Sequence, residues 1–260
     1  MQLVIDHVSQ TFTSGGKSLP VLEDIRLTLH EEEFAALVGP SGCGKSTLLN
    51  ICAGLLSPTE GAVRFTGEGL DREPRTSIVF QETGLMPWRT VYENIAFGLE
   101  AGKFLPKSEW DGRIRHYIQL VGLSGFENAY PHQLSGGMRQ RVGIARALAV
   151  SPDLLLMDEP FSALDAQTRI IMQEELVSLW EKTKLTTLYV THNIEEAVML
   201  ADRVILLSRR PGKVKDILEI GIPRADREKP EHSAEIAGFI RRIWEHISRD
   251  AKEAMTEVQP

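Results

Sequence analysis

The segment GPSGCGKST (residues 39–47) constrains the fold more than any other part of the sequence, because it matches the pattern G-x-x-x-x-G-K-[ST] in full. The apolar run FAALVG leads into it and the helix-like run KSTLLNICAGLL leads out of it. In such a strand–loop–helix order, the backbone N–H groups of the loop and the positive end of the helix face one anion. The sequence therefore predicts a site for nucleotide phosphates formed by Gly39, Pro40, Ser41, Gly42, Cys43, Gly44, Lys45, Ser46 and Thr47.

Side chains of this loop and of a second strand supply the groups that nucleotide hydrolysis needs. Lys45 can reach the β- and γ-phosphates, and the Ser46 hydroxyl can ligate Mg²⁺. The run LLLMDEP (154–160) predicts another buried strand, with Asp158 placed to help hold Mg²⁺ and Glu159 to act as general base on the attacking water. An Asp-Glu pair after a strand is usually a solvated edge, but the phosphate loop in the same chain favours the catalytic interpretation.

The composition excludes several kinds of partner. The 260 residues carry a formal net charge of −7, which argues against nucleic acid because a phosphate backbone attracts basic surfaces. Cys43 and Cys52, the two cysteines, fit neither a disulfide framework nor a zinc pattern. The sequence shows no signal peptide and no run of about 18 apolar residues. We therefore expect a soluble chain that meets a membrane only through a partner.

Strand-like and helix-like segments alternate along most of the chain, which predicts an α/β fold. A helix-like block from about 86 to 150 interrupts the alternation, and residues 61–69 are expected to be a turn-rich hairpin region. Residues 222–232 are rich in proline and charge and are expected to be a linker. The helix expected after them either packs on the core or contacts a partner, since apolar residues recur at helical spacing: Ile236, Phe239, Ile240, Ile243, Trp244 and Ile247.

The segment LSGGMRQR (134–141) indicates the class of phosphate-binding protein. Taken alone, its serine is an ordinary helix cap. With the other motifs, the sequence resembles the ABC ATPase family, whose signature loop reads LSGGQ; Met138 stands in place of the Gln. The resemblance covers about residues 3–220 and implies that this loop meets the ATP bound by a second subunit. Four residues match the signature: Leu134, Ser135, Gly136 and Gly137.

The resemblance also implies a domain organisation. It predicts a P-loop NTPase (RecA-like) α/β core with an N-terminal antiparallel β subdomain and a helical insertion that carries the signature motif. The ATPase domain would span residues 1–221, with the helical subdomain at about 86–150. The linker and the C-terminal amphipathic helix would occupy residues 222–260.

The remaining family motifs occur in order along the chain. Gln81, in VFQE, matches the glutamine that senses Mg²⁺ and the attacking water, so the metal ligands would be Ser46, Gln81 and Asp158. Asp165, in SALD (162–165), matches the D-loop residue that crosses to the other subunit. His192, in YVTH, matches the histidine that contacts the γ-phosphate, so catalysis would involve Glu159, His192 and Gln81. Phe12 lies where an aromatic residue stacks on adenine, although a phenylalanine in a strand is also commonly part of the core.

The family resemblance predicts partners as well. Two copies would form an ATP-dependent homodimer, and a membrane permease would dock near residues 82–100 on the cytoplasmic face of the membrane. Within the family the sequence most resembles the nitrate/sulfonate/taurine importer branch, in which an extracytoplasmic protein binds the solute and Met in place of the signature Gln is familiar. Trp88, Val91, Ile95 and Phe97, with a contribution from Met86, would cap an apolar groove for the permease. The alternative for each of these residues is a place in the core of the helical subdomain.

Two alternatives stay open at this point: the ATPase subunit of an ABC exporter, and an ABC ATPase that serves no transporter. Members that act on DNA carry a coiled-coil arm between the Q-loop and the signature, and too few residues separate Gln81 from Ser135 for such an arm. An inactive cassette is disfavoured because Lys45, Asp158, Glu159 and His192 are all chemically competent. The solute would contact other subunits, so this sequence does not identify it.

Overall fold

The computed structural model describes residues 1–67, 72–102, 105–162 and 164–257. The chain forms two compact units, which are described separately below. Unit 1 contains Met1–Asp71 and Thr186–Pro260, and unit 2 contains Arg72–Leu185. Among the described residues, no helix combines the length and the apolar composition needed to cross a bilayer.

Unit 1 begins with an antiparallel sheet of order β2-β1-β4, made of β1 (Gln2–Ser14), β2 (Lys17–Leu29) and β4 (Glu60–Thr66). Gly15 and Gly16 both have positive φ, as a tight hairpin connection requires. The strand β4 corrects the expectation of a turn-rich region at 61–69, since β4 pairs with β1 in register from Gln2↔Thr66 to Asp6↔Ala62. Residues 68–69 lie outside the described part of the chain.

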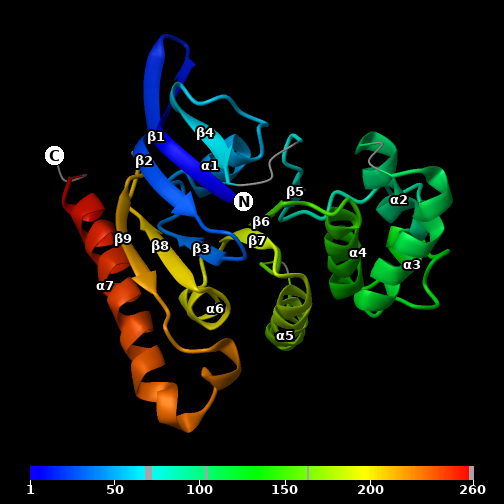
Figure 1. Ribbon diagram of the computed structural model, residues 1–260. Helices are drawn as coiled ribbons and strands as arrows, with labels where there is room; N and C mark the ends of the chain where they lie inside the picture. The colour runs from blue at the N-terminus through cyan, green and yellow to red at the C-terminus, as the bar shows by residue number, and fades with distance from the viewer. Residues whose placement is uncertain (68–71, 103–104, 163, 258–260) are drawn as a thin grey trace. The chain divides into compact units, whose positions relative to one another are not determined.

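The second sheet segment of unit 1 is mostly parallel, in the order β7-β3-β8-β9 (Figure 1). Its central strand β3 pairs in parallel with both neighbours and is buried at all five positions, as its apolar sequence predicted. Helices α1 and α6 pack against this sheet. The elements are β3 (Phe34–Val38), β7 (Thr186–Val190), β8 (Arg203–Leu207), the antiparallel edge strand β9 (Val214–Glu219), α1 (Lys45–Cys52) and α6 (Ile194–Leu200).

The C-terminal helix α7 (Ser233–Glu257) runs along β9 (Figure 1) and packs against α6. Arg242 forms an ion pair with Asp216 of β9 at 2.7 Å, and Ile243 is fully buried. The segment before it, expected to be a linker, contains the short helices η3 (Arg224–Asp226) and η4 (Pro230–His232).

Arg227 fixes that segment to α6. Its guanidinium donates hydrogen bonds to the carbonyl oxygens of Val198, Met199 and Ile222, each at 2.9 Å. Burial lowers the pKa of Arg227 to about 10. The first two acceptors belong to the last turn of α6, where carbonyls have no partner within the helix. The proline- and charge-rich stretch is thus packed against the core rather than extended.

The described residues of unit 2 form a parallel strand pair and four α-helices. The pair is β5 (Thr76–Val79) and β6 (Leu154–Asp158), and the helices are α2 (Val91–Gly102), α3 (Trp110–Leu120), α4 (Gly136–Ala149) and α5 (Ala166–Thr183), with short helices η1 (Lys107–Glu109) and η2 (Pro131–Gln133). Helices α2, α3 and α4 share one apolar core, which includes Val91, Ile95 and Leu99. The expectation that Val91 and Ile95 line an external groove is therefore wrong, since both are 1% exposed or less.

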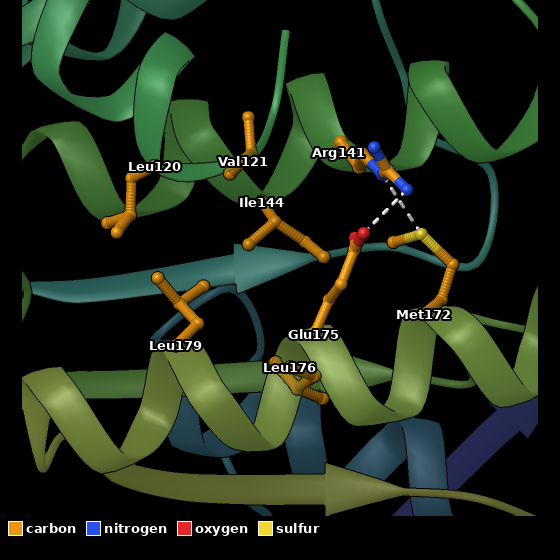
Figure 2. A pocket seen from close by; sticks show the side chains of 8 residues that line it. All are labelled: Leu120, Val121, Arg141, Ile144, Met172, Glu175, Leu176 and Leu179. Atoms are coloured by element: carbon orange, nitrogen blue, oxygen red, sulfur yellow. Dashed lines mark hydrogen bonds and ion pairs between the residues drawn. The ribbon is translucent and has the colours of Figure 1, made fainter.

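A small apolar cavity lies between α4 and α5 within unit 2. Figure 2 shows Arg141 of α4 directed toward Glu175 and Met172 of α5, at 2.7 Å from Glu175 Oε1 and 3.3 Å from Met172 Sδ. The cavity has a volume of about 30 Å³. Ligand pockets are usually about 300–1,000 Å³, so this space is a gap in helix packing and not a binding site. Its apolar lining consists of Leu120, Val121, Ile144, Met172, Leu176 and Leu179.

We predict that Ile95→Ala lowers the free energy of unfolding by about 2–5 kcal/mol, because it removes three carbons from a fully buried position. Urea denaturation followed by circular dichroism measures this change. Ile170→Ala on α5 is the matched control, since Ile170 is exposed and its truncation leaves no cavity. Equal stabilities of the two variants would contradict the assignment of Ile95 to the core.

Candidate functional site

The phosphate loop connects β3 to α1 through backbone conformations that glycine adopts at low cost. Gly42 has φ of 74° and Gly44 has φ of 105°, both in the region that L-residues avoid. A Cβ at Gly44 would lie 2.6 Å from Leu22 Cδ2, so close packing also requires glycine there. The helix bonding begins at once, with Leu48 N–H donating to the Gly44 carbonyl at 2.8 Å. The segment from Gly39 to Thr47 thus forms a tight loop at the start of α1.

Lys45 folds back over this loop. Its Nζ donates to the carbonyl oxygens of Gly39 (2.9 Å) and Pro40 (3.2 Å), and the side chain is nearly buried. These bonds hold an ammonium group at the mouth of the loop, where phosphate oxygens can become its acceptors. Ser46, the next residue, is exposed at the first turn of α1.

His192 lies at the same sheet edge as the phosphate loop. Strand β7 is the parallel neighbour of β3, with Leu37 paired to Val190, so both strands end together. The Thr191 N–H donates to the Leu37 carbonyl at 3.3 Å, and His192 follows with an exposed side chain. Ligands of α/β proteins bind at the carboxyl ends of parallel strands. Unit 1 therefore places the phosphate loop and His192 at the ends of neighbouring parallel strands.

Unit 2 has an equivalent edge at the ends of β5 and β6. Val79 pairs with Met157 in parallel, so Gln81 and Glu159 each follow that pair by two residues, and Asp158 ends β6. Gln81 is exposed, while Asp158 and Glu159 are partly buried. Unit 2 thus groups the amide and the two carboxylates that the sequence assigned to metal binding and catalysis.

The backbone of Glu159 is held in an unfavourable conformation. Its φ is +45°, which costs a non-glycine residue about 1–2 kcal/mol. The Glu159 carbonyl accepts hydrogen bonds from Ser162 Oγ (3.0 Å) and Ser162 N–H (3.2 Å). Strained residues of this kind cluster at functional sites, where the surrounding bonds keep them in place. Ser162 is a support that the sequence patterns did not reveal.

The signature loop and the D-loop lie against each other in unit 2. Ser135 caps α4, accepting from Met138 N–H at 3.2 Å, and Asp165 caps α5, accepting from Thr168 N–H at 3.0 Å. The bond from Thr168 N–H holds the pKa of the Asp165 carboxyl below its usual range. A Cβ at Gly137 would lie 3.2 Å from Thr168 Cγ2, so the two helix starts are in contact. Leu134 is buried, Ser135 and Gly136 are exposed, and Ala163 lies outside the described residues.

Phe12 lies near the tip of the β1–β2 hairpin, opposite Leu19. Both side chains are substantially exposed. Phe12 therefore does not belong to the core, and its ring remains available for stacking on a planar group.

Around Trp88 the helical subdomain presents an aromatic surface. Trp88 is 73% exposed and Phe97 is also exposed, with the Arg89 guanidinium 5.3 Å from the Phe97 ring centre. The loop that carries Trp88 is fixed by Asn94, which is fully buried and accepts from Met86 N–H at 2.8 Å. Asn94 Nδ2 lies 2.9–3.2 Å from three acceptors, the carbonyls of Met86, Arg89 and Thr90. This anchor was missed in the sequence analysis, although an asparagine on an otherwise apolar helix face could have indicated it.

The turn between β8 and β9 packs against the phosphate loop at Cys43 and against β2. Its sequence RRPG did not reveal this role. Gly212 N–H donates to the Val21 carbonyl (2.8 Å), and the Gly212 carbonyl accepts from Glu23 N–H (3.0 Å). A Cβ at Gly212 would lie 2.3 Å from the carbonyl oxygen of Cys43. Only glycine lets the turn approach the loop this closely.

We predict that Gly212→Ala weakens ATP binding by about 5- to 150-fold, because the added methyl group displaces Cys43 and overpacking costs about 1–3 kcal/mol. Isothermal titration calorimetry with ATP measures the affinity. Gly221→Ala is the matched control, since a Cβ there meets no atom within 4 Å. Unchanged ATP affinity in a folded Gly212→Ala protein would show that the turn does not shape the loop.

Comparisons with known proteins identify the family of this chain. The family model described as ABC transporter matches residues 22–162. An uncharacterized ABC transporter ATP-binding protein of Methanocaldococcus jannaschii is 50% identical over 229 residues, covering 86% of this chain and 84% of that protein. The aliphatic sulfonates import ATP-binding protein SsuB of Bacillus cereus is 43% identical over 237 residues, covering 91% of this chain and 93% of that protein.

A third relative is longer than this chain. The bicarbonate transport ATP-binding protein CmpC of Synechococcus elongatus is 47% identical over 226 residues, which cover 85% of this chain and 34% of that protein. Among solved structures, a dimeric bacterial ABC transporter cassette has a TM-score of 0.73 and 33% identity, covering 85% of this chain and all of that chain. Another structure shows a dimeric cassette in a post-hydrolysis state bound to ADP and Pi, with a TM-score of 0.72 and 32% identity.

These matches confirm the predicted α/β P-loop NTPase fold and the predicted ATPase activity. The family model covers more than half of the chain, and the matches to two relatives extend over most of this chain and most of each relative. The chain belongs to the ABC transporter family as one of its ATP-binding cassettes.

Proposed function

We propose that this chain is the ATP-hydrolysing subunit of an importer for small anionic solutes of the sulfonate or bicarbonate kind. The observation that carries the proposal is the similarity to the aliphatic sulfonates import ATP-binding protein SsuB, which spans 93% of that protein. The similarity to a bicarbonate transport ATP-binding protein points to the same class of solute. Nitrate, sulfonates and taurine share a small oxyanion group, which in taurine is a sulfonate beside an ammonium group, and this group is the feature common to the proposed solutes.

Each group at the two strand edges has a proposed role toward ATP. The loop from Gly39 to Thr47 binds the phosphates through backbone N–H groups, with Lys45 on the β- and γ-phosphates. Glu159 orients and deprotonates the attacking water, and His192 contacts the γ-phosphate. Gln81 contacts the same water, and Phe12 stacks on the adenine.

Mg²⁺ fits the oxygen donors that the sequence assigned to it. Among the described residues, no group of three or more His, Cys, Asp or Glu side chains is arranged to hold a metal. Mg²⁺ usually binds through one or two carboxylates and the phosphates of the nucleotide, so a dedicated cage of acidic side chains is not required. We propose Ser46, Asp158 and Gln81 as its protein ligands. When bound, the ion neutralises charge on the phosphates.

Dimerisation is part of the proposal, since the related cassettes of known structure are dimeric. Leu134, Ser135, Gly136 and Gly137 would meet the ATP of a second copy, and Asp165 would cross to it. The exposed Ser135 hydroxyl and the start of α4 offer hydrogen-bond donors to a phosphate. ATP then stabilises the closed pair, and hydrolysis releases it.

We predict that Glu159→Gln lowers the rate of ATP hydrolysis by about 10²- to 10⁴-fold, because an amide cannot accept the proton of the attacking water. ATP binding is retained, so the variant accumulates as an ATP-bound dimer. Phosphate release measures hydrolysis, and gel filtration with ATP and Mg²⁺ measures the dimer.

The control for this variant is Glu174→Gln, which makes the same change at an exposed position of α5. The control should hydrolyse ATP at the rate of the natural protein. A Glu159→Gln protein that turns over ATP at that same rate, or stays monomeric with ATP, would contradict the proposed role of Glu159.

The membrane partner is proposed to dock near residues 82–100, on the cytoplasmic face of the membrane. The surface available there consists of Trp88, Phe97 and the partly exposed Met86, since Val91 and Ile95 are buried. Large exposed aromatic residues are frequent anchors of protein interfaces. Through the permease, the chain would act together with an extracytoplasmic solute-binding protein.

We predict that Trp88→Asp weakens permease binding by about 30-fold, the effect of losing an interface residue worth about 2 kcal/mol. ATP binding and ATP-dependent dimerisation stay unchanged, because Trp88 contacts solvent in the free chain. Uptake of a labelled alkanesulfonate by cells with the whole transport system measures coupling. Leu55→Asp is the control at another exposed apolar residue. Normal uptake with Trp88→Asp would place the docking surface elsewhere.

A further inference from the structure

A buried carboxylate lies close in sequence to His192 and has no part in the proposed chemistry. Glu196, in the first turn of α6, is 6% exposed. Its Oε1 accepts a hydrogen bond from the Tyr189 hydroxyl at 2.7 Å, and its Oε2 accepts one from the Thr191 hydroxyl. Tyr189 and Thr191 are also buried. Burial of a carboxylate is unfavourable unless such bonds compensate for the lost water.

The two residues that flank His192 in the sequence both take part in these bonds. Thr191 directly precedes it, and the Thr191 Oγ1 that donates to Glu196 also accepts from the Asn193 N–H at 3.0 Å. Asn193 directly follows His192, and its side chain accepts from the Glu196 N–H at 3.2 Å. The two residues next to His192 are therefore both tied to Glu196, while the His192 side chain is exposed.

The arrangement differs from ordinary helix capping. Asn193 is the N-cap of α6 and Glu196 is three residues later, which is the spacing of a capping box. In a capping box the Glu side chain accepts from the N-cap N–H, but here Thr191 Oγ1 accepts from the Asn193 N–H. Glu196 instead accepts from hydroxyls at the end of β7 and just beyond it. It thus connects the strand that leads to His192 with the helix that leads away from it.

We propose that Glu196, through Tyr189 and Thr191, is a positioning residue that fixes the direction of His192 toward the γ-phosphate. This rests on the proposed role of His192. The strand end is itself fixed, because Thr191 N–H bonds to the Leu37 carbonyl next to the phosphate loop.

The test separates turnover from nucleotide affinity. Glu196→Gln is expected to lower kcat about tenfold, since small displacements of a catalytic group have large effects on rate. The affinities for ATP and ADP stay within about twofold, because the phosphate loop is untouched. Glu195→Gln, on the exposed face of the same turn, is the matched control and should behave like the natural protein.

A second pair of variants distinguishes a positioning effect from a loss of folding. Thr191→Val removes the hydroxyl at nearly constant volume, and Thr191→Ser keeps it. We expect Thr191→Val to lower kcat as Glu196→Gln does and Thr191→Ser to restore it. A purely structural role would instead lower the melting temperature and the nucleotide affinity together with kcat.

The imidazole signal of His192 gives a readout that does not depend on activity. In ¹H–¹⁵N spectra, with His192→Ala identifying the signal, we expect it to shift in Glu196→Gln and Thr191→Val but not in Glu195→Gln. An unmoved signal, or a normal kcat in both variants, would overturn the positioning role while leaving the proposed function intact. Full turnover by His192→Ala would instead overturn the role of His192 and the present inference with it.

Discussion

The parallel pairing of β3 with β7 is the constraint on which the nucleotide site of unit 1 depends. The register that pairs Leu37 with Val190 makes the chain leave the sheet at Gly39 and Thr191 along one edge. A slip of one residue would displace His192 by about 3.3 Å along the sheet. A hydrogen bond from His192 would be lost after such a shift, because donor–acceptor distances vary by only a few tenths of an ångström. The strand register must therefore be specified by side-chain packing. The complete burial of both strands supplies that specification, since a slipped strand would expose its side chains to different neighbours.

Several supports act on the backbone next to the reactive groups. Gly212 approaches the Cys43 carbonyl so closely that a Cβ would not fit, Ser162 donates to the Glu159 carbonyl, and Glu196 accepts from the hydroxyl of Thr191. Each support lies within a few residues of a sheet edge. A common physical reason is that a loop at the end of a strand has few backbone bonds of its own, so its geometry must come from neighbouring side chains and turns.

Sequence patterns predicted the parts of the fold that depend on local order. The runs FAALV and LLLMD are buried strands, because an apolar run of that length can hardly be anything else between a polar segment and a glycine loop. Ser135 is a helix cap, the ordinary role of a serine before a helix-like run, whereas the cap that Asp165 forms on α5 was not predicted. The grouping of Gln81, Asp158 and Glu159 follows from parallel strands ending at one edge.

The features that the sequence analysis failed to predict depend on contacts between segments far apart in the chain. The spacing of Val91 and Ile95 shows that α2 has an apolar face, but whether α3 and α4 or another protein covers that face is a tertiary matter. Gly61 and Gly67 made β4 resemble a turn, and its pairing with β1 overrides their weak strand preference. Asn193 and Glu196 have the spacing of a capping box, and the sequence does not reveal that Thr191 Oγ1 accepts from the Asn193 N–H.

The groups proposed to act on one ATP belong to two different units of the chain. Lys45 and His192 are in unit 1, whereas Gln81, Asp158 and Glu159 are in unit 2. Each set is fixed inside its own unit by a parallel strand pair, so neither set can adjust freely to the loss of a phosphate. Packed elements change between discrete arrangements and resist gradual deformation. Within unit 2, the helix starts at Ser135 and Asp165 are in contact through Gly137 and Thr168, so a displacement of either start requires the other to adjust.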